Sequence, residues 1–301
     1  MFSFPEKLPV FFNDQKLQND FEKNGFAVMP FYTQPQLDEL NSFFYSISGM
    51  PKQGFFPTTF FQDKATRDLV HERVTNIAAK SIEKNFKDIK IVHGSFIIKN
   101  PGKESELRLH QDMSLVDESK FAGANIWVPL VDLTPKNGAL YVLPGSHRIF
   151  PTYRGASIPN MYDKHTHFIR DYLTPLYLKA GEAVVFDQSI IHYSPPNYSG
   201  KIRITTNIFV TQKNAAYRMY YYDKTRDRDP IEIFEQEDDF MTKFMQFGYD
   251  IYARPEIGKS LGFTDYNFPV LDEKVMIEKY GSLPQPSLFK KMIDKFRYAH
   301  R

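Results

Sequence analysis

Apolar side chains recur at helical spacing in the first third of the chain. Between residues 34 and 47 they fall on one helical face, with a proline early in the segment, where proline fits the first turn. Residues 17–25 and 64–86 have the same spacing, and the first of these segments ends at a glycine. Residues 26–30 form a short apolar run stopped by proline and predict a strand. We therefore expect residues 1–88 to form a helical buttress.

The pattern changes after residue 88, where short apolar runs alternate with turn residues. These runs predict strands, and an Asn-Gly turn precedes the fourth of them; they span residues 89–99, 107–113, 125–133, 139–143, 176–178, 181–187 and 201–210. Many short strands with glycine and proline turns, preceded by helices, are typical of a β-sandwich or barrel. We expect residues 89–213 to form this core.

Three segments lie outside the strand pattern. Residues 148–175 have no periodicity and read as a long insertion, which makes them a candidate lid, because loops of this length in compact domains are usually functional or mobile. Residues 231–247 and 284–301 favour helices, so residues 214–301 are expected to be a C-terminal helical extension. No internal repeat or low-complexity linker divides the chain, and a single domain over residues 1–301 is the economical interpretation.

The amino-acid composition says little about the fold, but it excludes several kinds of functional site. Hydrophobic residues make up 42% and charged residues 25%, which is ordinary for a soluble globular protein. The net charge of +2 gives no argument for a nucleic-acid or membrane partner, and nothing indicates the oligomeric state. There is no cysteine, so disulfides, thiolate metal sites and cysteine nucleophiles are excluded. The first residues lack an apolar run behind basic residues, and we expect a cytoplasmic protein.

One histidine and one carboxylate stand two residues apart in the run 107–113. If this run is a strand, His110 and Asp112 point to the same face and Gln111 to the other. They are two thirds of the ligand set that holds non-haem Fe(II) while leaving coordination positions open. His192, after a later apolar run, offers the missing imidazole. A structural His-Asp pair is the alternative interpretation of the two residues taken alone.

An arginine follows these candidate ligands. Arg203 begins the strand after His192, and a guanidinium makes bidentate, charge-assisted bonds to planar carboxylates. A cosubstrate that carries a carboxylate at its far end would need such a residue.

Together, these residues resemble the phytanoyl-CoA dioxygenase family of Fe(II)/2-oxoglutarate oxygenases. The resemblance covers roughly residues 15–215 and rests on the order and spacing of five motifs, His110-Gln111-Asp112, 137–147, 181–186, 192–197 and Arg203. It implies a double-stranded β-helix, or jelly-roll, whose mouth holds Fe(II) through His110, Asp112 and His192. It also implies 2-oxoglutarate and O₂ as cosubstrates.

The same matching implies the cosubstrate site. Arg203 would bind the distal carboxylate of 2-oxoglutarate, together with Ser194. Trp127 falls where the family often has an aromatic residue beside the cosubstrate, although a core tryptophan on a strand is an equal alternative. Thr205 shares a face with Arg203 and is expected to pack in the barrel. Lys99 is expected to be exposed, with a role in binding 2-oxoglutarate or substrate as the alternative.

The remaining histidines are weighed separately. His147 belongs to a Pro-Gly-Ser-His turn and is expected to be structural. His165 and His167 have the spacing of a metal pair, but they lie in the insertion without a third ligand nearby, and we expect them to belong to the lid.

The function that the resemblance implies is hydroxylation of an unactivated C–H bond, with release of succinate and CO₂. Asp112 favours hydroxylation, or another oxidation such as desaturation, over halogenation, because the related halogenases lack this carboxylate. Arginines and tyrosines between residues 153 and 222 suggest a small polar substrate, such as an amino acid or a natural-product intermediate. The alternatives are a peptide or protein hydroxylase of the same chemistry and a non-catalytic jelly-roll binding protein.

Overall fold

Two antiparallel sheets form the core of the computed structural model, which describes residues 9–149, 152–228, 230–243 and 250–281. The larger sheet has the order β1-β8-β5-β10-β3-β2, with β1 (Phe26–Pro30), β2 (Phe55–Pro57), β3 (Ile89–Lys99), β5 (Gly123–Pro129), β8 (Glu182–Asp187) and β10 (Arg203–Gln212). The smaller has the order β4-β9-β6-β7, with β4 (Leu107–His110), β6 (Leu140–Val142), β7 (Thr174–Leu176) and β9 (His192–Ser194). The predicted mainly β, jelly-roll core is confirmed.

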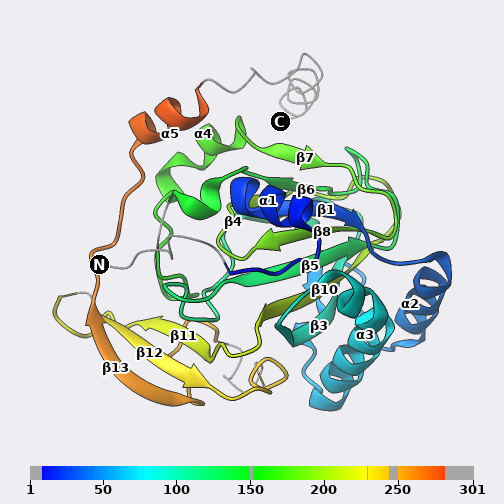
Figure 1. The fold of residues 1–301 in the computed structure, drawn as a ribbon, viewed down its shortest axis with the longest axis horizontal. Helices are drawn as coiled ribbons and strands as arrows, with labels where there is room; N and C mark the ends of the chain where they lie inside the picture. Colours follow the sequence, from blue (N-terminus) through cyan, green and yellow to red (C-terminus); the bar gives the residue numbers. More distant parts are fainter. Residues whose placement is uncertain (1–8, 150–151, 229, 244–249, 282–301) are drawn as a thin grey trace.

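Helices cover the outer face of the larger sheet. As predicted, α1 (Gln15–Asn24), α2 (Gln34–Ser46) and α3 (Lys64–Asn85) precede the core, and Figure 1 shows α2 and α3 beside β3 and β10. The period of two divides β8 between two apolar layers: Ala183 and Val185 pack with these helices, whereas Val184 and Phe186 pack with the smaller sheet. Residues 1–88 also supply β1 and β2, so they are more than a helical buttress.

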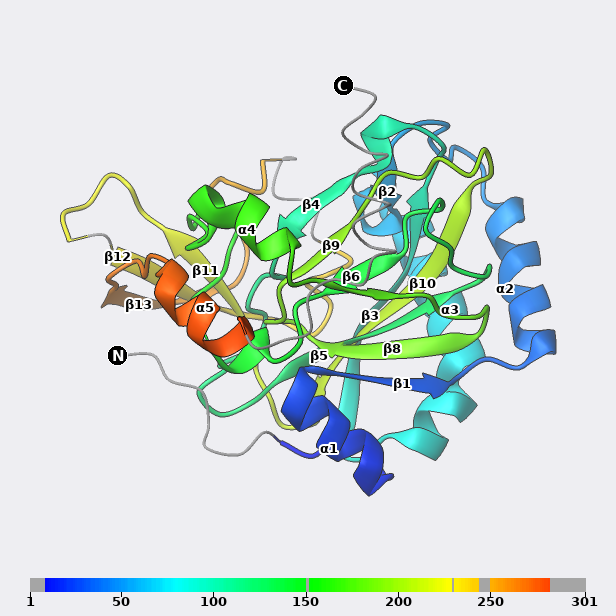
Figure 2. The ribbon, with the colours of Figure 1, turned by 90° about the horizontal axis from the view of Figure 1, so that it is seen from above.

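The C-terminal region is not the helical extension expected for residues 214–301. Strands β11 (Tyr217–Tyr222), β12 (Pro230–Gln236) and β13 (Lys259–Asp265) form a third antiparallel sheet, which lies at the end of the molecule opposite α2 (Figure 2). The helix predicted over residues 231–247 is therefore wrong across β12. Glu232, which a surface helix would expose, is buried and accepts hydrogen bonds from Arg254 and Ser260.

Within the described part of this region, one helix does occur. The helix α5 (Glu273–Tyr280) follows the third sheet, and its Met276 belongs to the apolar cluster that also contains Leu140 of β6 and Val184 of β8. The helix predicted over residues 284–301 lies outside the described residues.

Short elements connect the strands of the core. A 3₁₀ turn, η1 (Thr58–Phe60), follows β2, and η2 (Lys103–Ser105) precedes β4. The insertion 148–175 begins at the last residue of η3 (Ser146–Arg148) and contains η4 (Asp163–His165) and α4 (Thr166–Arg170). Its last residues belong to β7. Among the described residues, no helix combines the length and apolar character needed to cross a bilayer, and the cytoplasmic location stays a prediction.

Candidate metal and cosubstrate site

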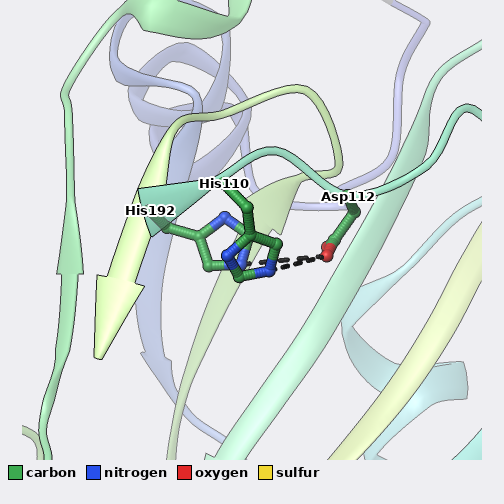
Figure 3. Close-up of side chains that lie close together, drawn as sticks. All are labelled: His110, Asp112 and His192. Atoms are coloured by element: carbon green, nitrogen blue, oxygen red, sulfur yellow. Dashed lines mark ion pairs between the residues drawn. The ribbon is translucent and has the colours of Figure 1, made fainter. Parts of the chain in front are cut away.

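Two histidines face each other on neighbouring strands of the smaller sheet. His110 ends β4 and His192 begins β9, and the two residues are direct partners in the antiparallel ladder, with ring centroids 4.1 Å apart (Figure 3). Each Nδ1 lies within hydrogen-bond distance of a main-chain carbonyl, Arg108 O at 2.8 Å for His110 and Ile190 O at 3.0 Å for His192. A protonated Nδ1 donating to these carbonyls leaves both Nε2 atoms as electron-pair donors.

Asp112 completes the cluster from outside the strand. Its Oδ1 lies 3.5 Å from His110 Nε2 and 3.8 Å from His192 Nε2, and ligand atoms of the three residues lie within 4.8 Å of one another. The prediction that Asp112 continues the strand is wrong, because β4 ends at His110 and the Asp112 N–H donates instead to Gln188 O at 3.0 Å. The three side chains nevertheless converge (Figure 3).

The second carboxylate oxygen of Asp112 is also held. Asn125 Nδ2 donates to Asp112 Oδ2 at 2.7 Å, and Asn207 Nδ2 donates to Asn125 Oδ1 at 2.8 Å. Asn125 lies on β5 and Asn207 on the adjacent strand β10, where Asn125 pairs with Phe209, two residues beyond Asn207, so this relay joins neighbouring strands of the larger sheet. Only Oδ1 of the carboxylate is therefore left to face the histidines.

The protonation states suit metal binding. Burial, helped by the neighbouring His110, lowers the pKa of His192 to about 4. Burial acts to raise the pKa of Asp112, but His192 and His110 outweigh it and lower that pKa. A neutral imidazole and an ionised carboxylate are the forms that ligate metals, so the donor set fits a divalent ion such as Fe(II).

A buried cation lies in the same barrel. Arg203 is buried, its guanidinium lies 5.2 Å from the ring centroid of Trp127, and Nη1 donates to Gly138 O at 3.2 Å. Among the described residues its Nε has no hydrogen-bond partner and no carboxylate forms an ion pair with it. Burial lowers the pKa of Arg203 to about 9. A desolvated guanidinium with a free N–H is a binding group for an anion.

The other residues predicted for the cosubstrate site surround this arginine. Ser194 donates its hydroxyl to Gly138 O at 2.8 Å, the carbonyl that Arg203 also contacts. Thr205 is buried and donates to Ile97 O, so it packs in the barrel as expected.

Lys99 differs from its expected exposed position. It is fully buried opposite Arg203 in the β3–β10 ladder, and its Nζ donates to Ser194 O at 2.8 Å and Pro195 O at 2.7 Å. Burial, together with the charge of Arg203, lowers the pKa of Lys99 to about 5. Lys99 thus fixes the chain just after His192.

Three residues surround Asp112 without any motif in the sequence that indicates it. Arg154 donates from Nε to Asp112 O at 2.7 Å and forms a buried ion pair with Glu118, to which Gln188 also donates. Glu118 stands in the charged run 117–120, which resembles a solvated turn, and only the folded chain reveals its burial.

The remaining histidines lie outside the site. His147 is buried, its Nε2 lies 3.2 Å from Glu22 O, and burial lowers its pKa to about 4, as suits a structural role. His165 and His167 belong to no three-ligand cluster among the described residues. Two pockets border the site beside Gln111 and Met113, and neither is lined by a metal-ligand candidate.

Comparisons with known proteins agree with this arrangement. The family model for phytanoyl-CoA dioxygenase (PhyH) matches residues 21–205. Phytanoyl-CoA dioxygenase 1 of Oryza sativa subsp. japonica is 27% identical over 45% of this chain and 49% of its own length. A phytanoyl-CoA dioxygenase domain-containing protein 1 homolog of Dictyostelium discoideum is 30% identical over 36% of this chain and 41% of its own. The chain thus spans about half the length of the curated relatives it matches, or less.

A solved structure shares the fold. The non-heme alpha ketoglutarate dependent carbocyclase SnoK from nogalamycin biosynthesis superposes with a TM-score of 0.50 at 14% identity, over 68% of this chain and 86% of SnoK. The family match covers more than half of the chain and contains the three converging residues and Arg203. The chain belongs to the phytanoyl-CoA dioxygenase family.

Proposed function

We propose that the protein is an Fe(II)- and 2-oxoglutarate-dependent dioxygenase. The observation that carries this proposal is the convergence of two imidazoles and one carboxylate, with ligand atoms within 4.8 Å of one another. The side chains of His110 and Asp112 are 28% and 33% exposed, so one side of the cluster is open to a cosubstrate and O₂. Two histidines and a carboxylate on one face of the metal are the ligand set of non-haem Fe(II) oxygenases.

Each residue has a stated role in this proposal. His110, Asp112 and His192 hold Fe(II), which supplies O₂ activation coupled to decarboxylation of 2-oxoglutarate to succinate and CO₂. Arg203 binds the distal carboxylate of 2-oxoglutarate, because its buried guanidinium has a free N–H and no acidic partner among the described residues. Ser194 and Trp127 lie beside this guanidinium, since Ser194 donates to the Gly138 carbonyl that Arg203 also contacts and the Trp127 ring centroid lies 5.2 Å from it.

The proposed substrate is a small polar molecule, an amino acid or a natural-product intermediate, hydroxylated at an unactivated C–H bond. Support comes from the pocket beside Gln111, whose lining combines Asn160 with Tyr153 and Tyr266, side chains that bind polar groups and flat surfaces. With a metal bound, the carboxylate of Asp112 would be a ligand that the related halogenases lack, which supports hydroxylation, or another oxidation such as desaturation, over halogenation.

We also propose that residues 1–301 act as one domain. Leu271 and Met276, near the end of the described chain, pack in the same apolar layer as Leu140 and Ile190 of the core.

The first test is succinate release by the purified protein with Fe(II), ascorbate and 2-oxoglutarate. Amino acids, natural-product intermediates, peptides and fatty acyl-CoA are added as separate panels. We expect turnover that is lost in His110→Ala and Arg203→Met and kept in Arg73→Met, which changes a half-exposed arginine on α3.

Each panel distinguishes an alternative. Turnover with peptides alone would favour a peptide or protein hydroxylase, and activity with fatty acyl-CoA alone would overturn the polar substrate. A protein that bound neither Fe(II) nor 2-oxoglutarate would be a non-catalytic jelly-roll binding protein.

A further inference from the structure

The main chain at Asp112 belongs to no strand, and a closed ring of hydrogen bonds takes the place of a ladder. The Asp112 N–H donates to Gln188 O at 3.0 Å, and Gln188 Nε2 donates to Glu118 Oε1 at 2.5 Å. Arg154 donates to both carboxylate oxygens of Glu118, through Nη1 at 2.8 Å and through Nη2. Arg154 Nε then donates to Asp112 O at 2.7 Å and closes the ring. Both main-chain polar groups of Asp112 are thereby fixed.

The ring is built from buried charge. The side chains of Arg154 and Glu118 are 6% and 5% exposed, and they pair in the two-bond geometry that orients a guanidinium most strongly. The Ser114 hydroxyl donates a hydrogen bond to Glu118 Oε2, and the Ser114 main-chain N–H donates to Arg154 O. A buried ion pair contributes little net stability compared with apolar packing, so positional specificity is the better reason for keeping one beside a metal ligand.

The ring joins three segments that are distant in sequence. Glu118 follows β4, Arg154 lies near the start of the insertion, and Gln188 lies in the loop that leads from β8 into His192. Gln111 strengthens the link, because its Nε2 donates to Ser189 O in the same loop. The positions of Asp112 and of the strand that carries His192 therefore depend on one hydrogen-bonded unit. The start of the insertion is anchored to the site by Arg154.

We propose that Glu118 is a positioning residue of the iron site. It joins Arg154 to Gln188, and these two residues hold the Asp112 main chain so that its carboxylate faces the two imidazoles. The proposal rests on the proposed function, because it assumes that a metal binds at Asp112. Residues that orient metal ligands typically change metal affinity 10- to 100-fold when they are mutated, about the effect expected here.

The experiment compares two buried glutamates. In Glu118→Gln one carboxylate oxygen becomes an amide NH₂ group, which cannot accept a hydrogen bond. The N–H groups of Arg154 or Gln188 then lose their acceptor, so the ring opens. Glu232→Gln is the matched control, because Glu232 is buried in β12 and accepts two bonds from one arginine, Arg254, without contact to the metal ligands. Three quantities are measured without O₂: Fe(II) affinity, the visible spectrum of the Co(II) form, and the thermal unfolding midpoint of the metal-free protein.

We expect Glu118→Gln to weaken Fe(II) binding about 10- to 100-fold and to shift the Co(II) spectrum. Glu232→Gln should lower the unfolding midpoint while leaving affinity and spectrum unchanged. Arg154→Lys keeps the positive charge but replaces the planar guanidinium with a single ammonium, which cannot hold Glu118 and Asp112 O in the same geometry. Arg154→Lys should therefore weaken Fe(II) binding as well. If Glu118→Gln does not fold, the Fe(II) affinity of Arg154→Lys tests the positioning role instead.

The outcomes separate the two proposals. A parent protein that bound no Fe(II) or Co(II) would overturn the proposed function, and this inference with it. A parent that bound both metals, with affinities within about twofold in Glu118→Gln and Arg154→Lys, would overturn the positioning role alone.

Discussion

Two buried arginines show how hydrogen-bond partners separate binding from structure. Arg67 donates to three main-chain carbonyls, Phe61 O, Gln62 O and Thr242 O, so its donors are used within the fold. Arg203 donates to Gly138 O, and its Nε has no partner among the described residues. We interpret Arg67 as a structural residue and Arg203 as a ligand-binding residue, although both side chains are almost wholly buried.

Replacing each arginine by methionine tests this difference. Arg203→Met should weaken 2-oxoglutarate binding by about 100-fold or more, because each lost charge-assisted bond is worth about 1.5–3 kcal/mol. It should leave the free energy of unfolding unchanged or higher, because an uncompensated buried charge is removed. Arg67→Met should lower the free energy of unfolding by about 2–4 kcal/mol, since buried carbonyls lose their donors. Calorimetric titration and urea unfolding measure the two effects, and a destabilised Arg203→Met that still binds 2-oxoglutarate would contradict the assignment.

Lys99 makes a second prediction, for the dependence of stability on pH. Its pKa falls from 10.5 in the unfolded chain to about 5 in the folded protein, so between these values the unfolded chain binds the extra proton. The contribution to stability is complete above pH 10.5 and is lost as the pH falls toward 5, at about 1.4 kcal/mol per pH unit. In Lys99→Met the free energy of unfolding should rise less steeply with pH than in the parent, by about 1.4 kcal/mol per pH unit. Urea unfolding of the parent and the variant at several pH values checks it, and equal slopes would show that Lys99 stays charged when buried.

The site shows what residue-level reasoning can and cannot predict. Spacing and residue type, with the resemblance to a family, pointed to His110, Asp112, His192 and Arg203, because metal and carboxylate chemistry restricts the side chains that can serve. The structure brings the first three together, and the role of Arg203 stays a prediction. Burial was not predictable. Lys99 and Glu118 look like surface residues in the sequence, and only long-range contacts make one a buried base and the other half of a buried ion pair.

At the scale of elements, the junction between α1 and β1 depends on one glycine. Gly25 ends α1 in the left-handed region at φ 81°, and its carbonyl accepts from the Asp187 N–H at the end of β8. A Cβ on Gly25 would lie 2.6 Å from His147 Nδ1, a buried ring held by Glu22 O. The expected structural role of His147 is therefore to pack against this junction.

We expect Gly25→Ala to lower the free energy of unfolding by about 2–4 kcal/mol, the sum of left-handed strain and overpacking. Gly200→Ala is the matched control, because Gly200 has φ 74° but nothing lies within 4 Å of its added Cβ. It should cost only the strain, about 1–2 kcal/mol. Equal effects in urea unfolding would mean that the contact with His147 carries no energy.

Elements were predictable where the local signal agreed with the tertiary contacts. In α2 a capping box of Thr33 and Gln36 and one apolar face act together, and the helix was predicted correctly. In β12 they conflict. The glutamates of this strand favour a surface helix, and the partner that buries Glu232 is Arg254, 22 residues further along the chain. No local pattern contains that contact.

At the scale of the whole molecule, pairing between distant strands was the least predictable feature. β1, near the N-terminus, pairs with β8, and β5 and β10 separate β8 from β3 in the same sheet. Periodicity predicts that such strands exist, but it does not name their partners. The jelly-roll order came from the resemblance to a family. The third sheet, β11-β12-β13, lies beyond the matched residues, and neither the pattern nor the resemblance predicted it.

Buried neutral histidines should make the whole molecule sensitive to acid. Burial lowers the pKa of His93 to about 3 and that of His147 to about 4, whereas in the unfolded chain both titrate near 6.5. Their contribution to stability is complete above pH 6.5 and is lost as the pH falls. Below pH 6.5 the unfolded chain binds protons at these histidines, whereas the folded chain does not, so acid favours the unfolded chain. Each histidine should therefore contribute about 1.4 kcal/mol per pH unit to the dependence of the free energy of unfolding on pH, between about pH 6 and 4.

Two substitutions test this contribution. His93→Gln should remove the contribution of one histidine, and His167→Gln, which changes an exposed histidine, should remove none. Denaturant unfolding of the metal-free proteins across this range measures the slopes, and an unchanged slope in His93→Gln would mean that the folded protein accommodates a charged His93.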